Sequence, residues 1–278
     1  MPLEDLHLVL LPHITLPRLE RFSTVLYVFF HSSDSNELIR TTLSPFLVNH
    51  GPTLRSLKLE AFKKVDMSSA LLGLPRMPCL KSLHISHLFL GMEPTSFAGH
   101  HQFLETHQSQ LQHFTFDFVG QSPALNIAIP DEFFNQEWCR VLLPELQSLS
   151  LQFHRFIIPS SEAAIPYLQR HIPTVETLII HALQFSYEQI SSILMGPTPG
   201  GYQLTRLRIL DIQIWCFSPA FLSLLVRQAP HLQSLKLTAS VIGPDKQPAR
   251  FGRNRVPEVR RFPILNVASL EKMIKSAS

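Results

Sequence analysis

A nine-residue phrase returns along the whole chain and limits what the chain can fold into. Its clearest copy, at 229–237, is APHLQSLKL: an apolar residue, proline, any residue, leucine, two residues, leucine, one residue, leucine. The frame also fits 16–24, 51–59, 77–85, 108–116, 143–151, 172–180, 204–212 and, more weakly, 256–264, and an unfinished copy opens the chain at 3–8. Repetition at steps of roughly 25–35 residues indicates a repeat protein, in which each unit buries its apolar face against its neighbours.

Each repeat is predicted to hold one strand and one helix. The end of the phrase alternates apolar and variable residues, which is the period of a strand with one buried face. Between phrases the apolar residues recur at helical spacing, and Ser186 and Ser218 stand where N-caps belong. Helices are predicted at 34–49, 66–74, 95–108, 131–142, 161–171, 186–195 and 218–229. In most copies the proline of the phrase ends the preceding helix, and Pro45 is predicted to kink or interrupt the first one.

Composition supports a folded protein. The chain has 278 residues, of which 45% are hydrophobic and 16% charged, so there is ample material for a core and no case for global disorder. Its three cysteines, Cys79, Cys139 and Cys216, are odd in number and far apart, which argues against a disulfide framework. The N-terminus lacks the basic cluster of a signal peptide, and no apolar run approaches the roughly 18–20 residues that span a bilayer. We therefore expect a soluble protein of the cytoplasm or nucleus.

The phrase Leu-x-x-Leu-x-Leu followed by a helix resembles the leucine-rich repeat, and the resemblance covers nearly the whole chain. The longer form LP-x-L-x-x-L-x-L, the irregular steps and the phenylalanines after the strands are most similar to the repeat half of F-box proteins, especially the large fungal set. The resemblance implies an α/β leucine-rich-repeat solenoid (a horseshoe), with a parallel sheet on its concave face and helices on its convex face. It also implies substrate recognition in an F-box-type ubiquitin ligase, in which an F-box docks on the ligase adaptor.

The whole chain, 1–278, is expected to form one irregular repeat domain of eight or nine repeats. We find no F-box segment in it, so an adaptor is a partner only if an F-box is supplied elsewhere. The segment 240–256 is expected to be an exposed basic loop, and 257–278 a C-terminal capping repeat with a last strand and a terminal helix. The sequence departs from the leucine-rich-repeat pattern after each strand, where residues such as Phe62, Leu183 and Trp215 replace the usual Asn or Cys.

The variable residues between the leucines are the candidate binding site. Alternation directs them away from the core, to the concave face of the predicted sheet. They form two columns, which are short, polar and mixed in sign, and this suits a protein or peptide partner better than a phosphate backbone. The candidate residues are Lys58, Glu60, His84, Ser86, Thr115, Asp117, Ser150, Gln152, His181, Asp211, Gln213, Lys236 and Thr238. The alternative is a merely solvated sheet face, since any half-exposed strand needs polar outward residues.

Trp215 follows Asp211 and Gln213 at two-residue spacing. Strict alternation places it on the concave face as an anchor for a partner. The turn of the leucine-rich repeat instead rotates this position into the core. We favour the core, because exposing the mostly apolar row to which Trp215 belongs would create a large apolar patch.

A second candidate is the basic segment 245–261, which holds six basic and two acidic residues. Arg250, Arg253 and Arg255 flank Phe251, and cations mixed with an aromatic residue occur where proteins contact single-stranded nucleic acid. The alternative function is thus a free-standing repeat scaffold whose basic loop contacts nucleic acid or an anionic partner. We favour a solvated loop and consider nucleic acid an improbable partner, since no second basic patch extends a binding track.

No catalytic motif emerges. The glycines of 196–201 lack a phosphate-binding pattern. The histidines also lack the helical i, i+4 spacing of a zinc motif, both at 84 and 87 and at 100, 101 and 107. Cys79 and Cys139 are expected to be buried small apolar residues. We therefore predict a protein that is not an enzyme, with no cofactor and no metal, which binds a protein through its concave sheet.

Overall fold

The computed structural model describes residues 10, 15–27, 37, 39–62, 67–88, 97–119, 131–154, 161–196, 204, 206–242 and 260–261. Contacts divide the chain into two compact units, Met1–Pro159 and Ser160–Ser278, and we refer to these as the N-terminal and C-terminal units.

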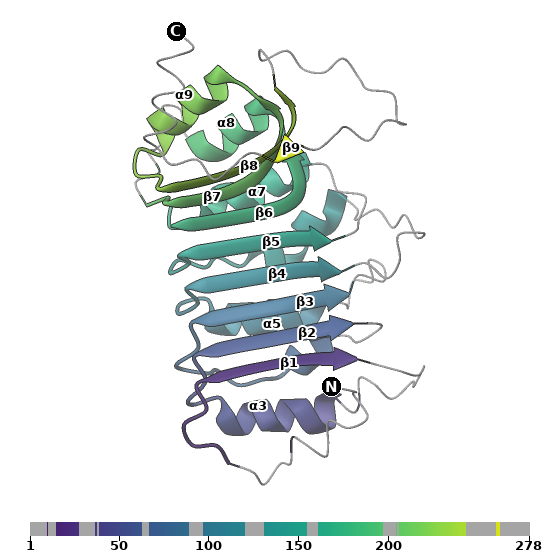
Figure 1. Ribbon diagram of the computed structural model, residues 1–278. Helices are drawn as coiled ribbons and strands as arrows, with labels where there is room; N and C mark the ends of the chain where they lie inside the picture. The colour runs from purple at the N-terminus through teal and green to yellow at the C-terminus, as the bar shows by residue number, and fades with distance from the viewer. Residues whose placement is uncertain are drawn as a thin grey trace. The chain divides into compact units, whose positions relative to one another are not determined.

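The N-terminal unit is built on five parallel strands that pair in chain order (Figure 1). The strands are β1 (Arg21–Tyr27), β2 (Ser56–Phe62), β3 (Ser82–Leu88), β4 (His113–Val119) and β5 (Ser148–His154). The segments between them form a π-helix η2 (Ile39–Leu43), α3 (Ser44–His50), α4 (Met67–Leu71), α5 (Ala98–His107), a 3-10 helix η4 (Asp131–Asn135) and α6 (Glu137–Arg140).

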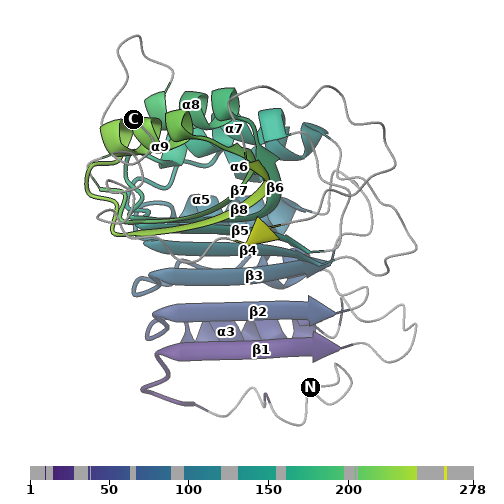
Figure 2. The ribbon, with the colours of Figure 1, turned by 45° about the horizontal axis from the view of Figure 1, so that its top comes forward.

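The C-terminal unit repeats this plan with β6 (Thr177–Phe185), β7 (Ile209–Phe217) and β8 (Ser234–Ile242), paired in parallel. Its helices are α7 (Ser161–His171), α8 (Tyr187–Met195) and α9 (Pro219–Gln228). Figure 2 shows α8 and α9 on one side of these strands, and among the described residues no helix lies on the other side. A two-residue strand, β9 (Arg260–Arg261), pairs with β8 in the antiparallel direction.

The leucines of the phrase build the core, as their period predicts. In the second repeat, Leu54, Leu57 and Leu59 are all fully buried. Burying one leucine side chain completely stabilises the fold by roughly 1.5–3 kcal/mol, so the repeated phrase supplies much of the stabilising apolar contact. Aromatic side chains fill the space beneath β4, where the rings of Phe116 and Trp138 stack with centroids 4.8 Å apart.

Two helix starts follow the sequence prediction closely. The Ser186 side chain accepts a hydrogen bond from the backbone N–H of Gln189, whose own side chain bonds back to the Ser186 N–H, a reciprocal capping box. Ser218 likewise accepts from the N–H of Phe221 and is followed by a proline in the first turn. Pro45 stands in the first turn of α3, directly after the π-helix, so the first predicted helix is interrupted there.

Several details differ from the sequence predictions. The strand β8 continues to Ile242, into the segment predicted as a loop, and β9 is antiparallel instead of adding a further parallel strand. Cys79 is exposed and not buried, because it lies in the turn after Pro78, whereas Cys139 is buried as predicted. The residues 243–259, with Arg250, Arg253 and Arg255, and the predicted terminal helix lie outside the described residues.

Parallel strands alternating with helices make this an α/β fold consistent with a leucine-rich-repeat-like solenoid. The horseshoe curvature and the single domain over 1–278 stay predictions. Within the described part of the chain, every helix is too short or too polar to cross a membrane.

Candidate functional site: the open face of the sheet

We call the side of each sheet that points away from the helices the open face. In the N-terminal unit the pairing of the strands aligns the variable residues in two rows, as the sequence predicts. The first row is Lys58, His84, Thr115 and Ser150, and the second row is Glu60, Ser86, Asp117 and Gln152. Strand β1 adds the exposed Ser23 beside Lys58, a position outside the predicted set.

Two members of these rows are less accessible than predicted. The side chains of Ser86 and Ser150 are buried, with exposed fractions of 3% and 6%. A short serine between longer side chains on neighbouring strands is shielded by them, even on an outward position. The accessible part of the face in this unit consists mainly of the longer charged and polar side chains.

The C-terminal unit departs from regular pairing at one place. Asp211 lies opposite Lys236 and Gln213 opposite Thr238, as predicted. Between β6 and β7, however, Ile179 pairs with Asp211 and Gln184 with Gln213, so β6 holds extra residues in a bulge. The two-residue alternation predicts His181 in the row of Gln213; His181 instead lies in the bulge and contacts Asp211.

Trp215, on β7, is exposed and not in the core, because the shift that the bulge introduces into β6 has no counterpart in the pairing of β7 with β8. Ala182 has a φ of 66°, a left-handed conformation that is uncommon outside glycine. After it, the odd-numbered residues of β6 point into the core instead of the even-numbered ones, and Leu183 is fully buried. Strand β7 pairs with β8 without any such shift, and its alternation continues beyond Gln213. Trp215 is therefore 36% exposed, on the same side of the strand as Asp211 and Gln213. The prediction of a core tryptophan was wrong.

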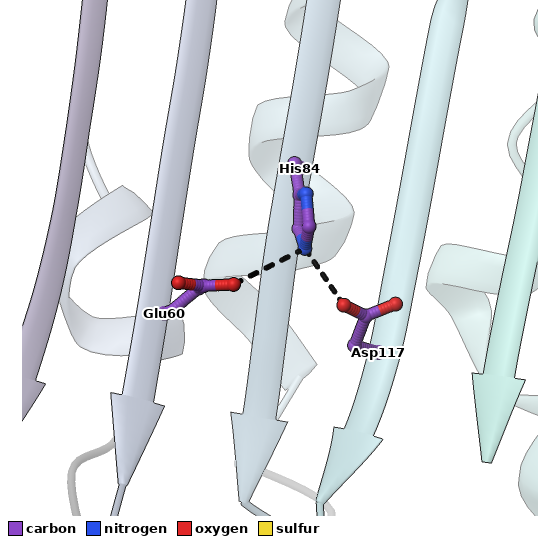
Figure 3. Close-up of side chains that lie close together, drawn as sticks. All are labelled: Glu60, His84 and Asp117. Carbon is purple, nitrogen blue, oxygen red and sulfur yellow. Dashed lines mark hydrogen bonds and ion pairs between the residues drawn. The ribbon is translucent and has the colours of Figure 1, made fainter. Parts of the chain in front are cut away.

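Charged side chains on the open face of the N-terminal unit form a chain of contacts. His84 Nε2 lies 2.8 Å from Asp117 Oδ2 and 3.8 Å from Glu60 Oε1. The same Glu60 oxygen lies 2.9 Å from Lys58 Nζ. Figure 3 shows Glu60, His84 and Asp117 reaching toward one another from three neighbouring strands. Asp117 is the least exposed of them, at 13% of its side chain.

A related contact chain lies on the open face of the C-terminal unit. His181 Nε2 is 3.0 Å from Asp211 Oδ2, and Lys236 Nζ is 2.7 Å from the same oxygen. Asp211, like Asp117, exposes only 13% of its side chain. In both units a shielded aspartate accepts hydrogen bonds from more exposed basic side chains, and this fixes the positions of those basic groups.

Each cluster joins residues from different repeats. The cluster of Glu60, His84 and Asp117 was not predicted, because it lies within no single helix or strand. The signal was present in the aligned phrases, since the three residues occupy adjacent and diagonal positions of consecutive strands, within reach of long side chains.

The fold and this face define an α/β repeat protein with a polar, charged sheet surface. Among solved structures it is similar to a chain in the crystal structure of the Rad7 and Elc1 complex in yeast, with a TM-score of 0.44 and 15% sequence identity. The match covers 84% of this chain and 65% of that chain, so the chain spans slightly less than two thirds of the length of the protein it matches. No family model and no curated protein matches the sequence.

Proposed function

We propose that this chain is a non-enzymatic interaction module that binds a protein through the open face of its sheet. In its most specific form it is the substrate-recognition part of an F-box-type ubiquitin ligase, acting in the cytoplasm or nucleus. That specific form rests on the resemblance of the repeated phrase, and the general form rests on the chemistry of the open face.

The observation that carries the proposal is the exposure of Trp215 beside a polar row. Tryptophan is enriched among the few residues that dominate protein–protein binding, because a large ring buries much apolar area at little cost in conformational entropy. On β7 this ring follows Gln213 and Asp211, and Lys236 lies across from Asp211 on β8. An apolar anchor next to fixed charges of both signs is the usual make-up of a protein interface.

The paired charges add to this surface in a second way. Lys236 and His181 both contact the shielded Asp211, so their hydrogen-bonding positions are set before a partner arrives. Side chains that are already ordered lose less conformational entropy on binding. The open face therefore offers a preorganised pattern that a partner can match.

The test replaces the polar part of this surface. The variant carries Asp211→Ala, Gln213→Ala and Lys236→Ala together, and the matched control carries Ser223→Ala and Arg227→Ala on α9, away from the open face. Partners are identified with the wild-type chain by crosslinking and mass spectrometry, and their affinities are then measured with purified proteins. The proposal predicts that the triple variant binds at least about tenfold more weakly and the control normally. Equal affinities for the triple variant and the wild type would overturn it.

The ligase form has its own test. If the chain selects substrates for a ligase, it must reach an adaptor protein, directly or through a subunit that carries an F-box. Co-purification of tagged, full-length protein with a ligase adaptor, and stabilisation of its partners when the proteasome is inhibited, would support this form. If partners bind the open face but live equally long with and without the chain, the ligase form is wrong and only the interaction module remains.

A further inference from the structure

The cluster on the N-terminal unit has the composition of a metal site, and its possible ligand atoms lie close together. One ligand atom from each of Glu60, His84 and Asp117 lies within 4.8 Å of the other two. A ligand distance of 2.0–2.2 Å places the donors of a tetrahedral zinc site roughly 3.3–3.6 Å apart. The present separations of 2.8 Å (His84 to Asp117) and 3.8 Å (His84 to Glu60) lie on either side of that value. Side-chain movements of roughly 0.5 Å would make these two separations fit a zinc ion.

One carboxylate oxygen of the aspartate in this cluster accepts no hydrogen bond from the described residues. Asp117 Oδ2 is bonded to His84, but Asp117 Oδ1 is buried and has no hydrogen-bond partner among the described residues. A buried carboxylate oxygen without a partner is costly, and a cation beside it would remove that cost. A positive ion near Asp117 Oδ1 would therefore be favourable.

The three side chains are also held by rigid elements. They project from the middle of β2, β3 and β4, whose pairing positions Lys58 opposite His84 and Ser86 opposite Asp117. Ligands fixed on neighbouring strands need little reorganisation, which favours a preformed site over adventitious surface binding. The side chains stay partly accessible, at 21% for Glu60 and 23% for His84, so an ion can enter from the solvent.

We propose that Glu60, His84 and Asp117 bind a divalent transition metal ion of the zinc class on the open face. An imidazole nitrogen with two carboxylate oxygens suits zinc better than magnesium or calcium, which prefer oxygen ligands alone. Three protein ligands leave a fourth position for water or for a donor group of a bound partner. The site is independent of the proposed interaction function and is tested without any partner.

Binding changes two existing contacts. His84 Nε2 now donates to the carboxylate of Asp117, so metal binding requires the neutral tautomer with its proton on Nδ1. The Glu60 oxygen must also leave Lys58, whose ammonium group competes with the metal for the same atom. Because Lys58 is 38% exposed, it can turn toward the solvent. Removing its charge should therefore strengthen metal binding.

The cluster of the C-terminal unit supplies the matched control. It has the same histidine–aspartate pair, but the third charged group in contact is the ammonium of Lys236 and not a second carboxylate. A site with one carboxylate and an ammonium group at 2.7 Å from it is a poor cation site. His181→Ala removes a histidine of similar exposure on the same kind of face without touching the proposed ligands.

Isothermal titration calorimetry of the full chain with Zn²⁺ alone tests the proposal, with Mg²⁺ and Ca²⁺ as comparison ions. The wild type and His181→Ala should each show one zinc site of the same affinity. His84→Ala, Glu60→Gln and Asp117→Asn should each weaken that site by at least about 10–100-fold, the loss typical even of outer-shell partners of metals. Lys58→Met should bind zinc more tightly than the wild type.

Two results would overturn the proposal: full zinc affinity in His84→Ala, or an equal loss in His181→Ala. X-ray absorption at the zinc edge of the wild type gives an answer that does not depend on the folding of any variant. One imidazole with oxygen ligands supports the site, and a spectrum with several imidazoles or with sulfur contradicts it.

Discussion

The Nε2 atom of His107 accepts a hydrogen bond from the backbone N–H of Met77 at 2.9 Å, across 30 residues of sequence. Its Nδ1 lies 2.7 Å from the carbonyl oxygen of Phe103 and donates to it, so a neutral imidazole uses both nitrogens. His50 makes the same pair of contacts with Leu16 and Phe46. Each histidine ends a helix and binds the first residue of the phrase that begins its own repeat. The hydrogen bond therefore ties the end of a repeat to its start.

Replacing His107 by leucine should destabilise the fold markedly. The substitution leaves the N–H of Met77 without its acceptor in a buried position, and it removes the bond to the Phe103 carbonyl as well. An orphaned buried donor costs about 1–3 kcal/mol, and we expect the free energy of unfolding to fall by about 2–3 kcal/mol. Urea denaturation followed by circular dichroism measures it. Glu105→Ala, at an exposed position of the same helix, should stay within about 0.5 kcal/mol of the wild type.

Acid should destabilise the protein through His171, a third buried histidine at the end of a helix. Burial, assisted by the nearby charge of Arg170, lowers the pKa of His171 to about 4, and burial also lowers the pKa of His107. A histidine whose pKa is lower in the folded state binds its proton more readily in the unfolded chain. The stability that depends on neutral His171 is therefore complete above about pH 6.5 and is lost as the pH falls toward about 4.

The measurement is the free energy of unfolding of the wild type and of His171→Leu at several pH values. Between about pH 7 and pH 4.5 the wild type should lose about 2 kcal/mol more than the variant. Only in the wild type does the unfolded chain gain a proton at residue 171 that the folded protein does not bind. Carboxylates that titrate in the same range contribute equally to both proteins and cancel. Parallel curves for the two proteins would refute the role assigned to His171.

Gly99 lies where α5 packs closely against the backbone of α4. A Cβ atom added there would lie 1.8 Å from the carbonyl oxygen of Ser68 in α4, far inside contact distance. Gly99→Ala must push α4 and α5 apart, and we expect a loss of about 3 kcal/mol or more. Gly73→Ala serves as the comparison, since its Cβ would meet nothing within 4 Å and only its φ of +75° opposes the substitution. That strain should cost about 1–2 kcal/mol. Similar losses for the two variants would argue against a helix contact at Gly99.

The strands could be predicted from the sequence because their cause is local. Each of the first eight strands begins two residues after the same leucine or valine of the phrase, for example Ser56 after Leu54 and Ser234 after Leu232. An alternation of period two directs these side chains inward whatever the neighbouring repeat contains. The caps at Ser186 and Ser218 are equally local, and both predictions are confirmed.

What the sequence did not reveal depends on pairing between strands. The bulge at Ala182 is invisible in the two-residue period, and yet it determines that Leu183 is buried, whereas Trp215 of the next strand follows the plain alternation and is exposed. The cluster of Glu60, His84 and Asp117 likewise exists only once three strands are placed side by side. The partner of His107 could not be read from its own helix either, since the atom that it binds lies 30 residues away.

The exposure of Trp215 can be tested first on the chain alone and then with a bound partner. The chain has two tryptophans, and Trp138 is 1% exposed whereas Trp215 is 36% exposed. Acrylamide should therefore quench one component of the fluorescence strongly, and Trp215→Phe should remove that component and leave a blue-shifted, protected emission. If the open face binds a protein, the partner should shield Trp215 from acrylamide. Trp215→Ala should then weaken binding by at least about 30-fold, the loss expected of a central anchor. Val226→Ala, equally exposed at 37% on α9, should not change the affinity, and equal losses in the two variants would mean that the tryptophan is no anchor.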